Sequence, residues 1–362
     1  MNISIAERRK EIQAELSEEN TGTILDTFLR WIGLGKFLST WAGILITFLL
    51  SVTLSFIFIA LSGELAGFYQ AGLKLSSGWK SVILFALFMS TASMIVANAY
   101  FHRAVAVLRD QVVDLAEAPE TLDEIRSWVE LLCRKPLILT LAVLLGGVAS
   151  ATYVATILGN LMGTPFPFSL FLSLTLFSMQ SSAFAGLGLA FLVLALRMRG
   201  FELRLFESDP ASSEIITHLS GLFSSYVYLV AAYGAILTYG VVRIGLVAYY
   251  LPLMFLFWAP ILAIFTGSQL SLAKIIQRSK WNTLNSIQKK IVALRKGQAL
   301  PEDEDRESLT WLLDYHERVR STRNSALDLG SWFNFLNSLL LPLFAFVLGN
   351  IDTLLKLLSG RP

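Results

Sequence analysis

Three histidines are the residues best suited to acid–base or metal chemistry in this chain of 362 residues. His102, His218 and His316 lie far apart in the sequence, and none has a second ligand at the spacing of a metal motif such as H-E-x-x-H. The single cysteine, Cys133, excludes a metal cluster built on thiolates. The sequence also lacks the motifs of phosphate-binding loops, serine hydrolases and dinucleotide-binding proteins. These features predict a protein that is not an enzyme and needs no metal or cofactor.

A second set of candidate residues lies in the last apolar segment, 331–352. At 3.6 residues per turn, six side chains of this segment fall within one narrow arc. They are Asn334, Ser338, Leu341, Ala345, Gly349 and Asp352. If copies of this helix surround an axis, the arc would line a pore, with an apolar constriction at Leu341 and a carboxylate ring at Asp352. A helix packed against its own bundle explains the same arc, so both interpretations stay open.

Prolines in the last two apolar segments are candidate hinges. Pro252 and Pro260 lie in the segment 244–273, and Pro342 lies in the last one. Proline removes a backbone hydrogen bond and bends a helix. Prolines are also tolerated in membrane helices because neighbouring groups bond the freed carbonyl, so a purely structural role is the alternative.

Small residues repeat every four positions in the middle of the chain, in two consecutive ladders. The first ladder is Gly147, Ala151, Ala155 and Gly159, and the second is Ser178, Ser182, Gly186 and Ala190. Helices in lipid associate through close packing of such residues. The break Gly163 to Pro167 between the ladders predicts a tight helical hairpin, with a structural rather than a ligand-binding role for the small residues.

The elements that carry these residues are apolar helices. Hydrophobic residues make up 54% of the chain and charged residues 15%, with a mean hydropathy of +0.61, whereas soluble domains carry roughly 25% charged residues. Lys, Arg, Asp and Glu are missing from six segments, each long enough to cross a bilayer. They are 41–63, 81–101, 137–196, 219–242, 244–273 and 329–351. The longest must hold two spans, so the sequence predicts an all-α polytopic membrane bundle of about seven transmembrane helices.

The basic residues predict the orientation of this bundle. Of the 29 Lys and Arg residues, 24 fall in four alternate connecting segments. These are 1–40, 102–136, 197–216 and 274–330. Because cytoplasmic loops accumulate basic residues, the N-terminus is predicted to be cytoplasmic and the C-terminus external, in the cell membrane. The same distribution argues against nucleic-acid binding, since topology accounts for the charge.

The chain divides accordingly into membrane and cytoplasmic parts. The predicted parts are a cytoplasmic amphipathic segment (1–40), transmembrane helices 1–6 (41–273) with cytoplasmic helices at 102–135 and 198–214, a cytoplasmic helical hairpin (274–330), transmembrane helix 7 (331–355) and an external tail (356–362). Apolar stripes at 105–115 and 281–294 mark the cytoplasmic helices as amphipathic.

This layout resembles that of the insect odorant and gustatory receptor channels. The shared features are seven spans, an inside N-terminus, an outside C-terminus and a helical hairpin before a bent last span. The resemblance implies that 305–328 helps to build a cytoplasmic anchor and that 331–352 lines a tetrameric cation pore. The aromatic and glutamine motif of that family is not visible in 339–345.

Two hypotheses about function follow. The leading one is a homo-oligomeric, channel-like membrane protein with a cytoplasmic helical anchor, since the spans lack the buried charges typical of ion-coupled transporters. The alternative is a non-conducting membrane scaffold or sensor subunit that docks a cytoplasmic protein partner through the stripes at 105–115 and 281–294. In both, the lipid bilayer is the principal partner.

Overall fold

Most of the chain whose structure is described is helical. The computed structural model describes residues 4–17, 41–63, 77–133, 136–162, 167–243, 247–296 and 303–326, together with Phe333 and Asn337. Within these ranges there are no strands, and the only β-bridge joins Ala116 to Leu203. The predicted all-α fold class is therefore confirmed.

Helices lie in each of the first five charge-free segments, and other helices lie outside those segments. They are α1 (Ile5–Glu15), α3 (Trp41–Leu61), α5 (Ser77–Val107), α6 (Val113–Leu115), α7 (Pro119–Cys133), α8 (Pro136–Met162), α9 (Phe168–Arg197), α10 (Glu214–Arg243), α11 (Val247–Lys296) and α12 (Asp303–Ser321). A π-helical turn, Leu108–Val112, joins α5 to α6. Pro119 and Pro136 are the first residues of α7 and α8. Proline is favoured there because the N–H groups of the first turn make no hydrogen bond within the helix.

Four helices in the described ranges are long and apolar enough to cross a membrane. They are Ile44–Leu61, Phe168–Gly200, Glu214–Ala235 and Trp258–Leu294, and α8 holds the shorter apolar stretch Val143–Thr156. An α-helix bonds its own backbone polar groups, which hydrocarbon requires. The fold is therefore compatible with integration into a membrane.

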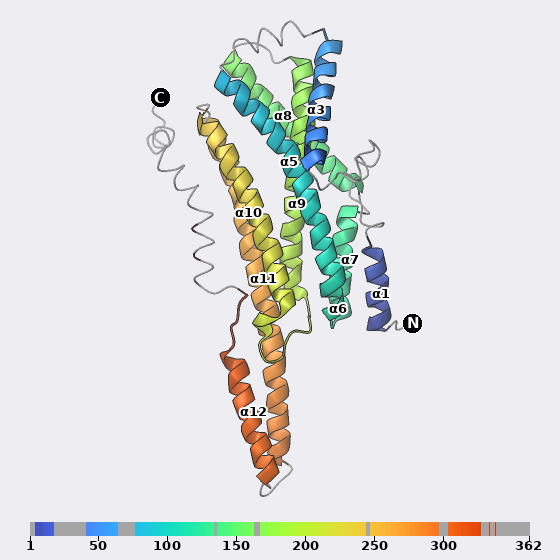
Figure 1. Cartoon of the computed structure of the whole chain (residues 1–362), viewed down its shortest axis with the longest axis vertical. Helices are drawn as coiled ribbons and strands as arrows, with labels where there is room; N and C mark the ends of the chain where they lie inside the picture. Colours follow the sequence, from blue (N-terminus) through green and yellow to red (C-terminus); the bar gives the residue numbers. More distant parts are fainter. Residues whose placement is uncertain are drawn as a thin grey trace.

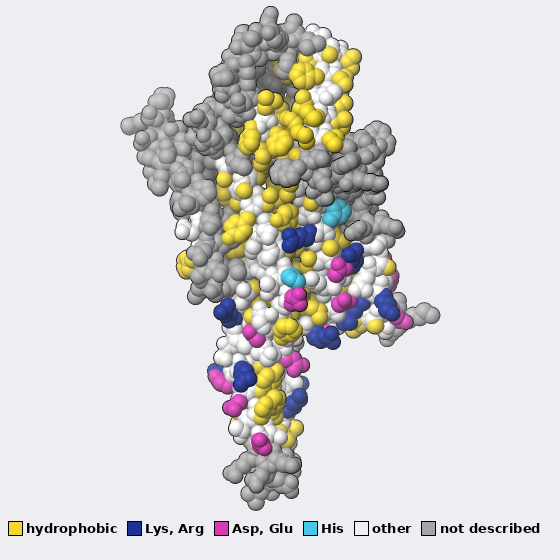
Figure 2. Space-filling view, viewed as in Figure 1, with side chains coloured by type: hydrophobic (Ala, Val, Ile, Leu, Met, Phe, Trp, Pro, Cys, Tyr) yellow, Lys and Arg dark blue, Asp and Glu magenta, His cyan; other side chains and the backbone are white. Residues whose placement is uncertain are grey.

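The molecule has an apolar end and a charged end. Figure 1 shows α3 and α8 at the top, and the α11–α12 hairpin projecting at the bottom. In Figure 2 hydrophobic side chains cover much of the described surface in the upper part, whereas Lys, Arg, Asp and Glu gather over the lower part. Helix α11 alone has 50 residues, a length of about 75 Å at 1.5 Å per residue. It therefore passes from the bundle into the hairpin without a break.

Helix α9 organises the bundle, because it contacts α3, α5, α7, α8 and α11. Aromatic side chains fill the core beside it. Phe191 stacks on Tyr226 of α10 with ring centroids 4.2 Å apart, and Trp128 of α7 donates from Nε1 to the carbonyl oxygen of Ala190 over 2.8 Å. Trp128 is fully buried, so α7 is anchored in the same core as the apolar helices.

The predicted close packing of α8 on α9 through small residues is confirmed, whereas 163–166 of the predicted turn lie outside the described residues. A Cβ atom on Gly147 would lie 2.6 Å from Cγ of Met179 and 3.0 Å from its backbone N and Cα atoms. On Gly146 it would lie 2.9 Å from Oγ of Ser182. Ala151 and Ala155 are buried on the same helix. The two backbones therefore approach each other as closely as glycine allows.

The segment 198–214 differs from the helix predicted for it. It forms a short 3-10 turn at Met198–Gly200, an extended stretch, and a second 3-10 turn at Pro210–Ser212. Phe201, Leu203 and Leu205 are buried and alternate with exposed residues, the two-residue period of an extended chain. The backbone bonds across to the end of α6, where the N–H of Arg204 donates to the carbonyl of Leu115 over 2.8 Å.

Helices α11 and α12 form a helical hairpin in the region predicted for one, 274–330, and its cytoplasmic location stays a prediction. Helices α11 and α12 pack together over Leu284, Ile287, Ile291, Leu312 and Val319. The residues between Lys296 and Asp303 lie outside the described residues.

Candidate functional site

The predicted pore residues lie outside the described residues. These are Asn334, Ser338, Leu341, Ala345, Gly349 and Asp352, together with the hinge candidate Pro342. Pro252 and Pro260 lie within α11, which is helical on both sides of each. The hinge and pore roles therefore stay predictions.

The three histidines lie on different helices. His102 is in α5, His218 in α10 and His316 in α12. His218 faces Gln111, with 2.7 Å between Nδ1 and Oε1, and its Nε2 is 3.8 Å from a carboxylate oxygen of Glu214. In the described part of the chain, no three His, Cys, Asp or Glu side chains are grouped so that they could hold a metal ion.

The structure instead brings together a polar cluster among the apolar helices. Gln180 of α9 is buried and binds two other helices. Its Oε1 accepts a hydrogen bond of 2.7 Å from Oγ1 of Thr91 in α5, and its Nε2 donates one of 2.9 Å to Oγ of Ser51 in α3. One amide therefore joins three helices.

A second pair of hydroxyls extends this cluster. Ser90 Oγ donates to the carbonyl oxygen of Phe177 over 2.7 Å and lies 2.8 Å from Oγ of Ser181. Polar side chains in a membrane helix usually face protein or water. Here the bonds are made within the chain, so the arrangement positions α3 and α5 against α9 and leaves little capacity for a reaction.

A spacing of hydroxyl residues in α3 could have indicated this cluster from the sequence. Thr47, Ser51 and Ser55 recur every four residues in α3, and all three are buried. Such a ladder of hydroxyls on an otherwise apolar helix indicates the face that meets protein. Gln180 lies between Ser178 and Ser182 of the predicted small-residue ladder, on a neighbouring face of the same helix.

At the charged end, Lys280 of α11 bonds the residues that follow α12. Lys280 is 7% exposed, and its Nζ donates to the carbonyl oxygen of Thr322 over 2.7 Å and to Oδ1 of Asn324 over 2.9 Å. Thr322 follows the last residue of α12, where helical carbonyls lack partners. The ammonium group therefore caps α12 at the point where the chain continues toward the last apolar segment.

The hairpin exposes large apolar side chains outside its own core. Trp281 is 62% exposed and Trp311 63%, and Leu313 and Val292 are also exposed. Trp311 stacks on Tyr315 with ring centroids 5.3 Å apart. Burial raises the pKa of Tyr315, and the negative charge of Glu207 raises it further. Exposed tryptophans on a charge-rich hairpin are a feature of contact surfaces.

The two apolar stripes predicted to dock a partner are occupied within the chain. Val105, Leu108 and Val112 are buried in the main core. The 281–294 stripe buries Leu284, Ile287 and Ile291 against α12 and leaves Trp281 exposed. Of the second stripe, Trp281 is therefore left exposed at the surface, and docking of a partner stays a prediction.

Fold and composition together define an α-helical protein whose described part holds four helices suited to a membrane. Comparisons with protein-family models, with curated proteins and with solved structures find no match to this chain.

Proposed function

We propose that this chain is a seven-span protein of the cell membrane that works as a homo-oligomeric, channel-like protein with a cytoplasmic helical anchor. In this proposal the charged end faces the cytoplasm and the C-terminus is external. The four apolar helices and the concentration of basic residues at the charged end support the orientation.

The observation that carries the proposal is the hairpin of α11 and α12. It continues an apolar helix out of the bundle, and it carries Trp281 and Trp311 on its surface. A rigid connection of this kind would transmit a change in subunit packing to the apolar part of the same helix. The apolar residues between α11 and α12 are buried against each other. The exposed tryptophans are not needed for that contact, so they are available to a neighbouring subunit.

Conduction in this proposal depends on the last apolar segment. Its predicted arc of amide, hydroxyl and small side chains could conduct ions without charged groups in the hydrocarbon. The alternative, a scaffold or sensor subunit, would use the same hairpin surface to bind a cytoplasmic protein. The two functions differ in whether the purified chain assembles with itself.

Assembly is tested with the double variant Trp281→Ser and Trp311→Ser. We expect wild-type protein in lipid nanodiscs to give a multimeric mass and the double variant to give a smaller one, because two large apolar contacts per subunit are lost. Particle mass is measured by native mass spectrometry, with circular dichroism as a check on helicity.

A matched control replaces two polar residues of the same hairpin, Lys289→Ser and Lys290→Ser, which are exposed in α11. These changes are expected to leave the mass unchanged. A monomeric wild type would count against the homo-oligomer and favour the scaffold.

A further inference from the structure

The N-terminal helix α1 is docked on the charged end of the bundle by few apolar contacts. It begins with a capping box, in which Ser4 and Glu7 bond each other's backbone N–H groups. Its contacts are with α6, α7 and the π-helical turn, and Figure 1 shows it beside α7. Ile12 and, just after the helix, Leu16 are fully buried. A helix of 11 residues is marginal alone, so α1 depends on this docking.

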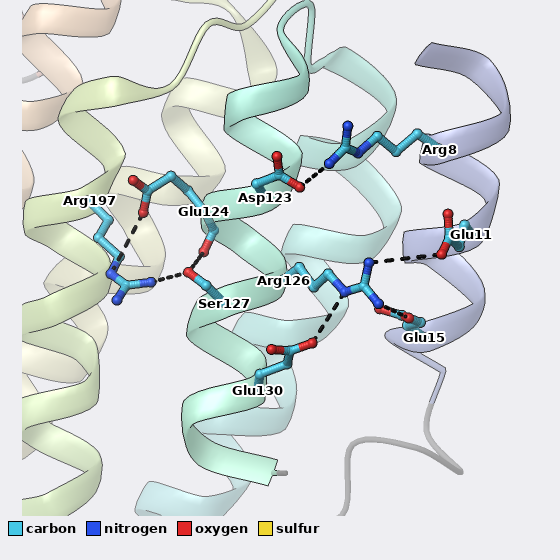
Figure 3. A network of polar contacts seen from close by, with 9 residues as sticks. All are labelled: Arg8, Glu11, Glu15, Asp123, Glu124, Arg126, Ser127, Glu130 and Arg197. Atoms are coloured by element: carbon cyan, nitrogen blue, oxygen red, sulfur yellow. Dashed lines mark hydrogen bonds and ion pairs between the residues drawn. The ribbon is translucent and has the colours of Figure 1, made fainter. Parts of the chain in front are cut away.

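Ion pairs make up much of the rest of the contact (Figure 3). Arg8 pairs with Asp123 of α7. Arg126 of α7 lies 2.8 Å from Glu15 and 3.9 Å from Glu11, both on α1, and 3.2 Å from Glu130 of its own helix. Its side chain is 36% exposed. These pairs are therefore open to screening by dissolved salt.

The opposite side of α7 faces the bundle. Arg197 of α9 donates to Oγ of Ser127 and lies 3.7 Å from a carboxylate oxygen of Glu124. Figure 3 shows α7 between α1 and α9, with charged residues on both sides. Helix α1 thus holds α7 from outside while α9 holds it from inside.

Two further α1 side chains, those of Arg9 and Gln13, bond residues near the end of α6, which continues α5 beyond the π-helical turn. Arg9 donates to the carbonyl oxygen of Ala116 over 2.5 Å from Nη2 and 3.2 Å from Nε. Ala116 caps α6, so Arg9 places positive charge at the negative end of that helix. Gln13 donates to Oδ1 of Asp114 over 2.6 Å and approaches the carbonyl of Arg109, in the π-helical turn, at 3.5 Å.

We propose that α1 is an electrostatic latch, a detachable helix whose ion pairs hold α7 and the end of α5 in their observed positions. Weakening the pairs releases α1 while the bundle stays folded, because the core of α7 is anchored separately through Trp128. Release uncovers the outer face of α7 and removes the cap from α6. The latch does not depend on whether the protein conducts ions.

The latch is tested by the distance between spin labels on α1 and α7. Labels are placed at Lys10→Cys and Glu120→Cys, two exposed positions, in full-length protein that carries Cys133→Ser. At low salt we expect one narrow distance distribution. At about 1 M salt, where the screening length is about 3 Å, we expect a broad distribution shifted to longer distances. Arg126→Ala should shift this release to lower salt.

Charge reversal separates electrostatic from merely structural effects. Arg8→Asp places like charges together at Asp123 and should release α1, whereas Arg8→Asp with Asp123→Arg should restore the narrow distance. Arg320→Ala, which removes an exposed ion pair with Glu317 on α12, should change nothing. Circular dichroism checks that each variant is folded. A narrow distance that survives in Arg8→Asp and Arg126→Ala at high salt would overturn the latch, as would failure of the charge swap to restore docking.

Discussion

Replacement of Gly147 by alanine is expected to destabilise the protein by about 1–3 kcal/mol, the usual cost of adding a methyl group to a well-packed contact. The new Cβ would lie 3.0 Å from the backbone N and Cα atoms of Met179, which a change of side-chain conformation cannot move. Helices α8 and α9 would have to separate, and the close contact between them would weaken. The measurement is thermal unfolding of the purified protein in one detergent.

Gly221→Ala is the matched control, since it makes the same change inside helix α10. A Cβ on Gly221 meets no atom within 4 Å. There the substitution should be neutral or stabilise by about 0.5–1 kcal/mol, because alanine loses less conformational freedom than glycine in a helix. Equal melting temperatures for the two variants would contradict the close packing of α8 on α9.

The second large effect is expected for Gln180→Leu. This change removes the amide that bonds Thr91 and Ser51, and it leaves both hydroxyls with one partner fewer. Interhelical hydrogen bonds in membranes contribute about 0.6 kcal/mol on average and up to about 1.7 kcal/mol. With two bonds lost, we expect a loss of roughly 1–2 kcal/mol in the free energy of unfolding, measured by denaturant titration in mixed micelles.

Gln269→Leu in α11 is the control for this prediction. Nε2 of Gln269 is buried and makes no hydrogen bond in the described structure, so its replacement removes an unsatisfied polar group. Stability should stay the same or rise. If Gln180→Leu proves as harmless as Gln269→Leu, the polar cluster does not hold the three helices together.

Much of the fold could be predicted because the pattern of charge is local information. Charge-free stretches gave the positions of α3, α5, α8, α9, α10 and the first part of α11. Residues spaced three and four apart, such as Leu284, Ile287 and Ile291, predicted a face of the hairpin that is in fact buried. The small-residue ladder likewise placed Gly147 at a helix contact.

Contacts between distant parts of the chain were less accessible from sequence. Gln180 could face lipid headgroups, a pore or another helix, and only the arrangement of α3 and α5 shows that Ser51 and Thr91 bond it. The docking of α1 joins residues more than 90 positions apart through charges that look like an ordinary solvated surface. The extended segment after α9 was missed because its two-residue alternation covers only Phe201 to Leu205.

The measurement that tests the central claim most directly is cation flux through liposomes that contain Ser338→Cys protein in a Cys133→Ser background. If the last apolar segment lines a pore, the liposomes will conduct cations, and a positively charged, water-soluble thiol reagent will modify residue 338 and reduce the flux. The Cys133→Ser protein without the Ser338→Cys change should conduct equally well, and the reagent should not alter its flux. Flux no higher than that of empty liposomes, or flux unchanged after modification of residue 338, would contradict the channel.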